Sequence, residues 1–122
     1  KEPNMARFTK LQVWQEARVL IRQVSELTRI MISEGDLIRQ IRRAAISVAS
    51  NLAEGSERGS DRDFLRFVRM ANASCAEVEA QATIAMDLAL ASPEQVIPVI
   101  DQAQRIGRML NRLMVRLDAG GG

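Results

Sequence analysis

The apolar residues of this chain recur every three or four positions over most of its length, which is the spacing of one face of an α-helix. In the first such stretch charged or amide side chains cover one side, and the apolar residues that keep this spacing are Val13, Trp14, Ala17, Leu20, Ile21, Val24, Leu27 and Met31. The pattern predicts four helices, at about Leu11–Ile32, Leu37–Glu54, Asp61–Leu90 and Pro93–Leu117. Because the connections between them are short, we expect an all-α, antiparallel up-down-up-down four-helix bundle.

Polar and small residues between the apolar stretches predict where the helices begin and end. Asp36 is expected to cap the second helix, and Gly55 to end it by adopting a positive φ. Ser60 is expected to cap the third helix, with Asp63 at the reciprocal position of a capping box. Ser92-Pro93 has the composition of an N-cap followed by a first-turn proline, which starts the fourth helix.

The third helix carries many small residues after Ala71, and small residues allow helices to approach closely. Further apolar side chains extend its apolar surface beyond a single face, namely Met70, Ile84, Met86, Leu88 and Leu90. We therefore predict that this helix is buried on more than one side. The second side would be an interface between subunits.

Length and composition fit one soluble domain. With 122 residues the chain matches the usual size of a single domain, which we place at residues 5–118. Residues 1–4 precede Met5 and are interpreted as an artificial extension, and residues 119–122 as a flexible tail. No stretch reaches the roughly 18 apolar residues of a membrane span, and no secretory leader opens the chain. We expect a cytoplasmic protein without membrane contact.

The residue types of the commonest catalytic chemistry are missing. The chain has no His and one Cys, so no zinc cluster, His-based general base or catalytic triad can form. Glu77 and Glu79 are two positions apart on a helix and therefore lie on different faces. Cys75 lies in an apolar helical stretch and is expected to be buried. We expect no enzyme activity, no metal and no cofactor.

Charge is unevenly distributed although its net value is only +2. All basic residues except Lys1 and Lys10 are arginine, and residues 70–100 hold four acids and no base. Arginines repeated along a helix face are suited to a phosphate backbone. The candidate nucleic-acid-binding residues are Arg39, Arg42, Arg43, Arg58, Arg62, Arg66, Arg105, Arg108, Arg112 and Arg116. The alternative is a solvated face, or salt bridges to acids on neighbouring helices or subunits, such as Glu77, Glu79 and Asp87.

Three segments of the chain together resemble a known family. They are residues 8–17 (FTKLQVWQEA), residues 40–55 (QIRRAAISVASNLAEG), and Arg58-Gly59-Ser60 with Asp63-Phe64. In order and spacing they are similar to the bacterial four-helix-bundle proteins encoded by intervening sequences in 23S ribosomal RNA genes. Those proteins are relatives of the accessory protein of diversity-generating retroelements. The resemblance covers roughly residues 8–90, whereas the fourth helix resembles nothing specific.

The resemblance implies a homopentamer without enzymatic activity. For the retroelement branch it further implies binding of nucleic acid and of a reverse transcriptase. The family motif falls on Arg42, Arg43, Asn51, Glu54, Gly55, Arg58 and Gly59.

Two functional hypotheses follow from the residues and the resemblance. The first is a homo-oligomeric binding protein whose arginine-bearing surface contacts RNA or DNA. The second is a protein-protein adaptor whose arginines contact an acidic partner.

Overall fold

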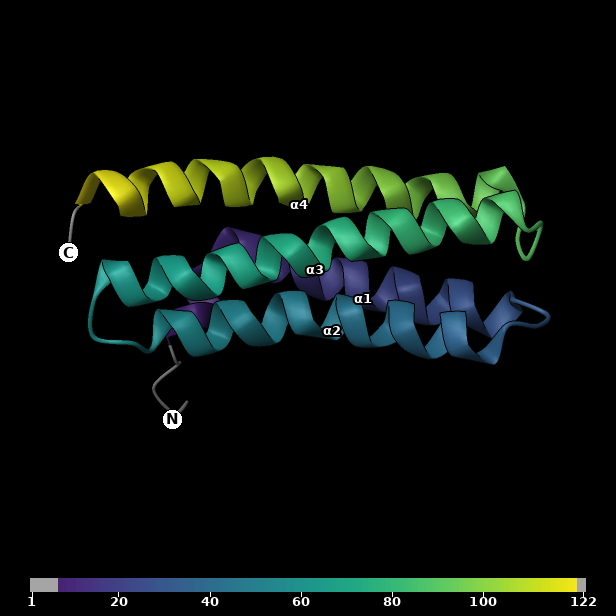
Figure 1. Ribbon diagram of the computed structural model, residues 1–122, viewed down its shortest axis with the longest axis horizontal. Helices are drawn as coiled ribbons and strands as arrows, with labels where there is room; N and C mark the ends of the chain where they lie inside the picture. The colour runs from purple at the N-terminus through teal and green to yellow at the C-terminus, as the bar shows by residue number, and fades with distance from the viewer. Residues whose placement is uncertain (1–6, 121–122) are drawn as a thin grey trace, which may run out of the picture.

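Four long helices lie side by side in a computed structural model of the chain, which describes residues 7–120 (Figure 1). They are α1 (Gln12–Ile30), α2 (Gly35–Ser56), α3 (Asp61–Asp87) and α4 (Pro93–Gly120), and a short 3-10 helix, η1 (Arg7–Lys10), precedes them. Consecutive helices run in opposite directions, and each packs against two neighbours. The predicted all-α four-helix bundle is therefore confirmed. Within residues 7–120 none of the helices combines the length and apolar character needed to cross a bilayer.

The core consists of the apolar stripes that the sequence pattern predicted. Leu20 from α1, Ile41 and Leu52 from α2, and Ile106 and Leu110 from α4 are completely buried. Burying a side chain of this size stabilises the fold by about 1.5–3 kcal/mol relative to leaving it in water. The apolar residues whose spacing predicted the helices are thus the ones whose burial stabilises the bundle.

The close packing of α3 on α2 depends on Gly55. Gly55 lies inside α2, which continues to Ser56, so the prediction that it ends the helix with a positive φ is wrong. A Cβ at this position would lie 2.6 Å from Cβ of Phe67 and 2.9 Å from the ring of Phe64. The glycine is needed because two aromatic residues of α3 pack directly on the backbone of α2.

The predicted caps of α3 and α4 are present. The N–H of Asp63 donates to Oγ of Ser60 at 3.1 Å, but the Asp63 carboxylate pairs with Arg66 and does not return to Ser60. At α4 the box is reciprocal: the N–H of Ser92 donates to Oε1 of Gln95 at 2.9 Å, and the N–H of Gln95 donates to Oγ of Ser92 at 3.3 Å. The two caps differ because the Asp63 side chain is one methylene shorter than that of Gln95. A reciprocal capping box uses Glu or Gln as the returning side chain.

Two other helix ends depart from the predictions. Asp36 does not cap α2: the helix begins at Gly35, its N-cap Glu34 has φ 67°, and the Asp36 carboxylate pairs with Arg39. Helix α3 ends at Asp87, before the predicted Leu90, because Ala89 adopts a left-handed conformation with φ 56°. The N–H of Leu90 then donates to the carbonyl of Ala85 at 3.0 Å, which closes the helix.

Within one chain α3 is buried on one side only. Its outer side exposes Met70 and Ile84, with exposed fractions of 45% and 44%, and the small residues Ala73, Ala76 and Ala80. The expected burial on a second side is therefore not found inside the single chain.

The domain was predicted at residues 5–118, and the structure describes residues 7–120. Ala119 and Gly120 continue α4, so they do not belong to a tail. Residues 1–4 and 121–122 lie outside the described residues.

Candidate nucleic-acid interface

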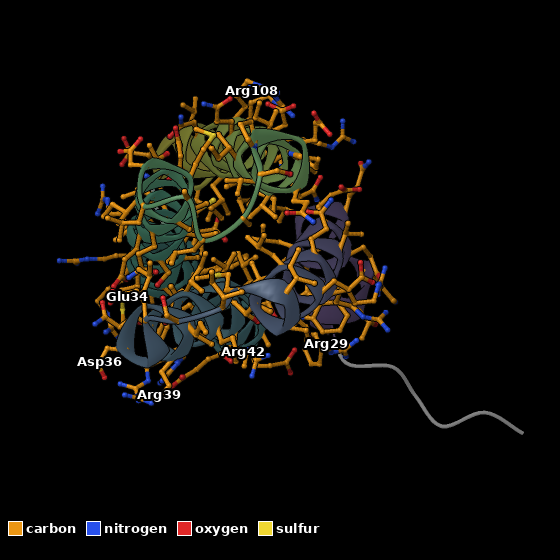
Figure 2. All side chains as sticks on the ribbon, turned by 90° about the vertical axis from the view of Figure 1, so that its right-hand side faces the viewer. Arg29, Glu34, Asp36, Arg39, Arg42 and Arg108 are labelled. Carbon is orange, nitrogen blue, oxygen red and sulfur yellow. The ribbon has the colours of Figure 1, made fainter. Side chains whose placement is uncertain are left out.

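The ten arginines predicted as binding residues fall on three separate surfaces of the bundle. One surface lies on α2, a second lies at the end where α2 passes into α3, and the third is the outer face of α4. Figure 2 shows Arg39 and Arg42 on one side of the molecule and Arg108 on the opposite side. One chain therefore cannot present all ten to a single ligand surface.

On α2, two of the three arginines are held by side chains of the same chain. Arg39 pairs with Asp36 one turn earlier. Nε of Arg42 donates to Oγ1 of Thr28 at 2.6 Å, and that buried hydroxyl donates to the carbonyl of Val24 at 2.8 Å. Arg42 thus fixes α2 against α1. Arg43 is exposed and forms no ion pair with any residue from 7 to 120.

At the end where α2 passes into α3, arginines surround one aromatic ring. The guanidinium groups of Arg58 and Arg66 lie 4.7 and 4.6 Å from the ring centroid of Phe67. Arg58 also pairs with Glu54 at 2.7 Å, and Arg66 pairs with Asp63 at 3.0 Å. These two arginines therefore hold the helix junction in place.

A shallow groove of about 450 Å³ lies beside that junction, and Arg62 and Arg69 contribute to its lining. Neither of the two forms an ion pair within the described part of the chain.

The outer face of α4 carries the least constrained arginines. Arg105 pairs with Glu16 of α1 at 3.3 Å. Arg108, Arg112 and Arg116 are exposed, follow at intervals of four residues, and have no acidic partner within residues 7–120. Three exposed guanidinium groups that form no ion pair within the described chain produce a positive potential directed at solvent.

Two grooves run beside this row. One, of about 310 Å³, lies between α3 and α4 and is lined by Asn72, Glu79, Gln104, Arg108 and Asn111 over a floor of small residues. The other, of about 170 Å³, lies between α1 and α4 and includes Gln12, Arg112 and Arg116. The sequence did not indicate the amide residues, because their position beside the arginines depends on which helix packs against α4.

The acids named as arginine partners do not pair with arginines in the described part of the same chain, and pairing across a subunit contact stays a prediction. The carboxylate of Glu79 accepts from Nε2 of Gln104 at 3.0 Å, and that of Glu77 lies 3.5 Å from Nε2 of Gln81. Within residues 7–120 neither these two nor Asp87 pairs with an arginine. Salt bridges are formed instead by acids that lie nearer to the arginines, such as Asp36 and Glu54.

Cys75 lies beneath the larger groove and is buried, as predicted. Its thiol donates to the carbonyl of Ala103 at 3.0 Å. Burial raises the pKa of this thiol to about 11, the charge of Glu79 acts in the same direction, and the backbone N–H of Gly107 opposes them. The thiolate that nucleophilic chemistry requires is therefore disfavoured at neutral pH. Within the described residues, no cluster of three or more acidic or cysteine ligands suited to a metal is found.

Comparison with known proteins identifies the family. A crystal structure of a protein of unknown function from the S23 ribosomal protein family of Bacteroides thetaiotaomicron VPI-5482 has a TM-score of 0.77. It is 18% identical over 84% of this chain and 97% of that chain, which shows a common fold. No curated protein matches the sequence. The model of the 23S rRNA-intervening sequence protein family matches residues 9–112, so the chain belongs to that family, as its motifs predicted.

Proposed function

We propose that this protein is a non-enzymatic, homo-oligomeric binding protein that contacts RNA or DNA through the outer face of α4. The observation that carries the proposal is the row of Arg108, Arg112 and Arg116, exposed and without an acidic partner within residues 7–120. Arginine is the side chain best suited to phosphate groups, since its planar fork donates two parallel hydrogen bonds. The neighbouring grooves add amide groups, which hydrogen-bond to phosphates, sugars and bases.

The proposed oligomer uses a different surface. Met70, Ala73, Ala80 and Ile84 form an exposed, mainly apolar strip along one side of α3, which Glu77 interrupts. Apolar side chains gathered on one exposed helix face favour contact with another protein surface. We propose a homopentamer, which the resemblance implies, with this strip at the subunit contact and the α4 row left accessible.

Two further parts of the proposal concern the cell. We propose that the protein acts in the cytoplasm. We further propose a reverse transcriptase as a partner, which the resemblance to the accessory protein of diversity-generating retroelements implies. A non-enzymatic role is supported by the absence of histidine from the sequence and by the buried, protonated Cys75.

Nucleic-acid binding is tested by fluorescence anisotropy on labelled structured RNA and duplex DNA at 50 and 200 mM salt. Affinity should fall steeply with salt, because bound cations are released when arginines neutralise phosphates. Replacing Arg108, Arg112 and Arg116 by alanine should reduce the slope of log K against log salt by about three, since each phosphate contact contributes about 0.9.

The matched control removes the same charge from another part of the bundle, by replacing Lys10, Arg22 and Arg29 with alanine. All three are exposed, and none of them lies on α4. This variant should keep most of the wild-type affinity. Equal losses in both triple variants would mean that net charge alone drives binding, and absence of binding at 50 mM salt refutes the proposal.

Light scattering coupled to chromatography tests the oligomer. The wild type should elute as a pentamer, and Met70→Glu with Ile84→Glu should dissociate it. Ile32→Glu is the control, because Ile32 is 84% exposed but lies outside α3. A monomeric wild type, or dissociation by the control alone, contradicts the assignment of the α3 strip.

An acidic protein partner is the competing function. It predicts that capture of a protein from native lysate depends on the α4 arginines and is unchanged by nuclease treatment. Capture that is lost after nuclease treatment supports the nucleic-acid proposal.

A further inference from the structure

Gly107 of α4 has no structural explanation. It lies in the interior of a helix, and a Cβ placed on it would meet nothing within 4 Å. It does not adopt a positive φ. Glycine inside a helix costs about 0.5–1 kcal/mol relative to alanine, and neither close packing nor backbone conformation requires it here. Gly55, by contrast, is required by Phe67.

Gly107 forms part of the floor of the groove between α3 and α4. Ala76 and Ala103 also line the groove, with side chains of one carbon. Any longer side chain at position 107 would project into the open space above it. The effect of the glycine is therefore to keep the groove, of about 310 Å³, free.

The walls of the groove are polar. Asn72 and Asn111 have carboxamides without a hydrogen-bond partner in the described chain, and Arg108 has no ion-pair partner there. The amide of Gln104, by contrast, has a hydrogen-bond partner, since its Nε2 donates to the carboxylate of Glu79 at 3.0 Å. An apolar helix packed here would bury the polar groups of Asn72, Asn111 and Arg108 without hydrogen-bond partners, which is costly. Paired donor and acceptor groups of Asn are instead suited to the edges of nucleobases.

We propose that this groove receives an unpaired nucleobase, with Asn72 and Asn111 reading its edge and Arg108 contacting the adjoining phosphate or stacking on the base. The proposal rests on the proposed binding of nucleic acid by α4 and deepens it. Because a base inside a duplex cannot enter a groove between two helices, the protein should prefer single-stranded or looped nucleic acid. Arg112 and Arg116 then follow the backbone beyond the bound base.

The test uses anisotropy with two probes, a labelled 20-nucleotide single-stranded RNA of mixed sequence and a 20-base-pair duplex of the same sequence. The wild type should bind the single strand at least 10-fold more tightly. Gly107→Leu fills the groove and should weaken single-strand binding at least 10-fold while changing duplex binding less than 2-fold. Gly107→Ala should have an intermediate effect.

Ile97→Leu is the matched control, since Ile97 is an exposed apolar residue of the same helix, outside the groove and before the arginine row. It should bind both probes as the wild type does. Circular dichroism melting checks that each variant folds, and Asn72→Ala with Asn111→Ala provides a second route if the leucine variant does not.

The outcomes separate the two proposals. Equal weakening of both probes by Gly107→Leu, or none on either, overturns the base site while leaving the α4 interface intact. Failure of the wild type to bind either probe overturns both proposals. Selective loss of single-strand binding in Gly107→Leu and in the asparagine variant, but not in the control, supports the base site.

Discussion

The contact between α2 and α3 and the outer face of α4 use the same residue types for different purposes. Both contain a helical glycine and a set of arginines. At the α2–α3 contact, the glycine admits Phe67 and the arginines are paired with Glu54 and Asp63. On α4, Gly107 faces open space and Arg112 has no acidic partner within residues 7–120. What surrounds a residue in space, and not its type, separates the packing region from the proposed binding region.

The largest expected effect tests the two glycines directly. Gly55→Ala should destabilise the fold by about 2–3 kcal/mol or more, because its Cβ would overlap Phe67 in a packed contact. Gly107→Ala should stabilise the fold by about 0.5–1 kcal/mol, because alanine favours the helix and meets open space. Urea unfolding followed by circular dichroism measures both. Two changes of the same sign would remove the distinction between the regions.

The second prediction concerns Cys75, which lies under the floor of the α4 groove. Its pKa is raised to about 11, so the folded state keeps the thiol neutral at pH values where the unfolded chain ionises it. Stability from this group is therefore complete below about pH 9 and is lost as the pH rises toward 11. The loss should be on the order of 2 kcal/mol, since one pKa unit corresponds to about 1.4 kcal/mol.

The sequence makes this alkaline titration simple to interpret. There is no tyrosine, and lysine occurs only at positions 1 and 10. Unfolding of the wild type and of Cys75→Ala, measured at pH 8, 9, 10 and 11 under reducing conditions, should show the loss in the wild type alone. The same loss in both proteins would mean that the floor of the groove is open to water and that the thiol titrates normally.

The third prediction compares arginines from the two regions. Arg58→Ala should destabilise the fold by about 1 kcal/mol, because it removes a cation–π contact with Phe67 and an ion pair with Glu54. Arg112→Ala should change stability by less than about 0.5 kcal/mol, as is usual for an exposed residue without a partner. Thermal unfolding of both variants makes the comparison. A larger loss for Arg112 than for Arg58 would contradict the assignment of α4 to binding.

Much of the fold could be predicted from the sequence because each helix is determined by residues that lie close together along the chain. The apolar periodicity predicted each helix, and the start of α4 at Ser92-Pro93 was exact because a capping residue and a first-turn proline lie side by side. The motifs in α1 to α3 identified the family. Misplaced ends, such as that of α3, reflect the conformation of one residue, Ala89, whose φ the residue type does not indicate.

The candidate site was less accessible, because it depends on neighbours that are distant in sequence. Arg42 is held by Thr28, and Arg105 by Glu16, across gaps of 14 and 89 residues. The sequence could therefore list arginines but could not separate the paired from the unpaired ones. Gly55 was misinterpreted for the same reason, since its contact with Phe67 crosses between two helices.

The last and smallest prediction adds a third kind of position to the comparison of Gly55 with Gly107. Ala89 has the left-handed conformation that favours glycine, at the end of α3. Ala89→Gly should stabilise the fold by about 0.5–1 kcal/mol, because it relieves the strain of a Cβ at positive φ. The control is Ala80→Gly, at an exposed helical position of α3, which should destabilise by a similar amount. Changes of opposite sign in the free energy of urea unfolding would show that backbone conformation determines the effect of a glycine in α3. Close packing determines it at Gly55, and open space determines it at Gly107.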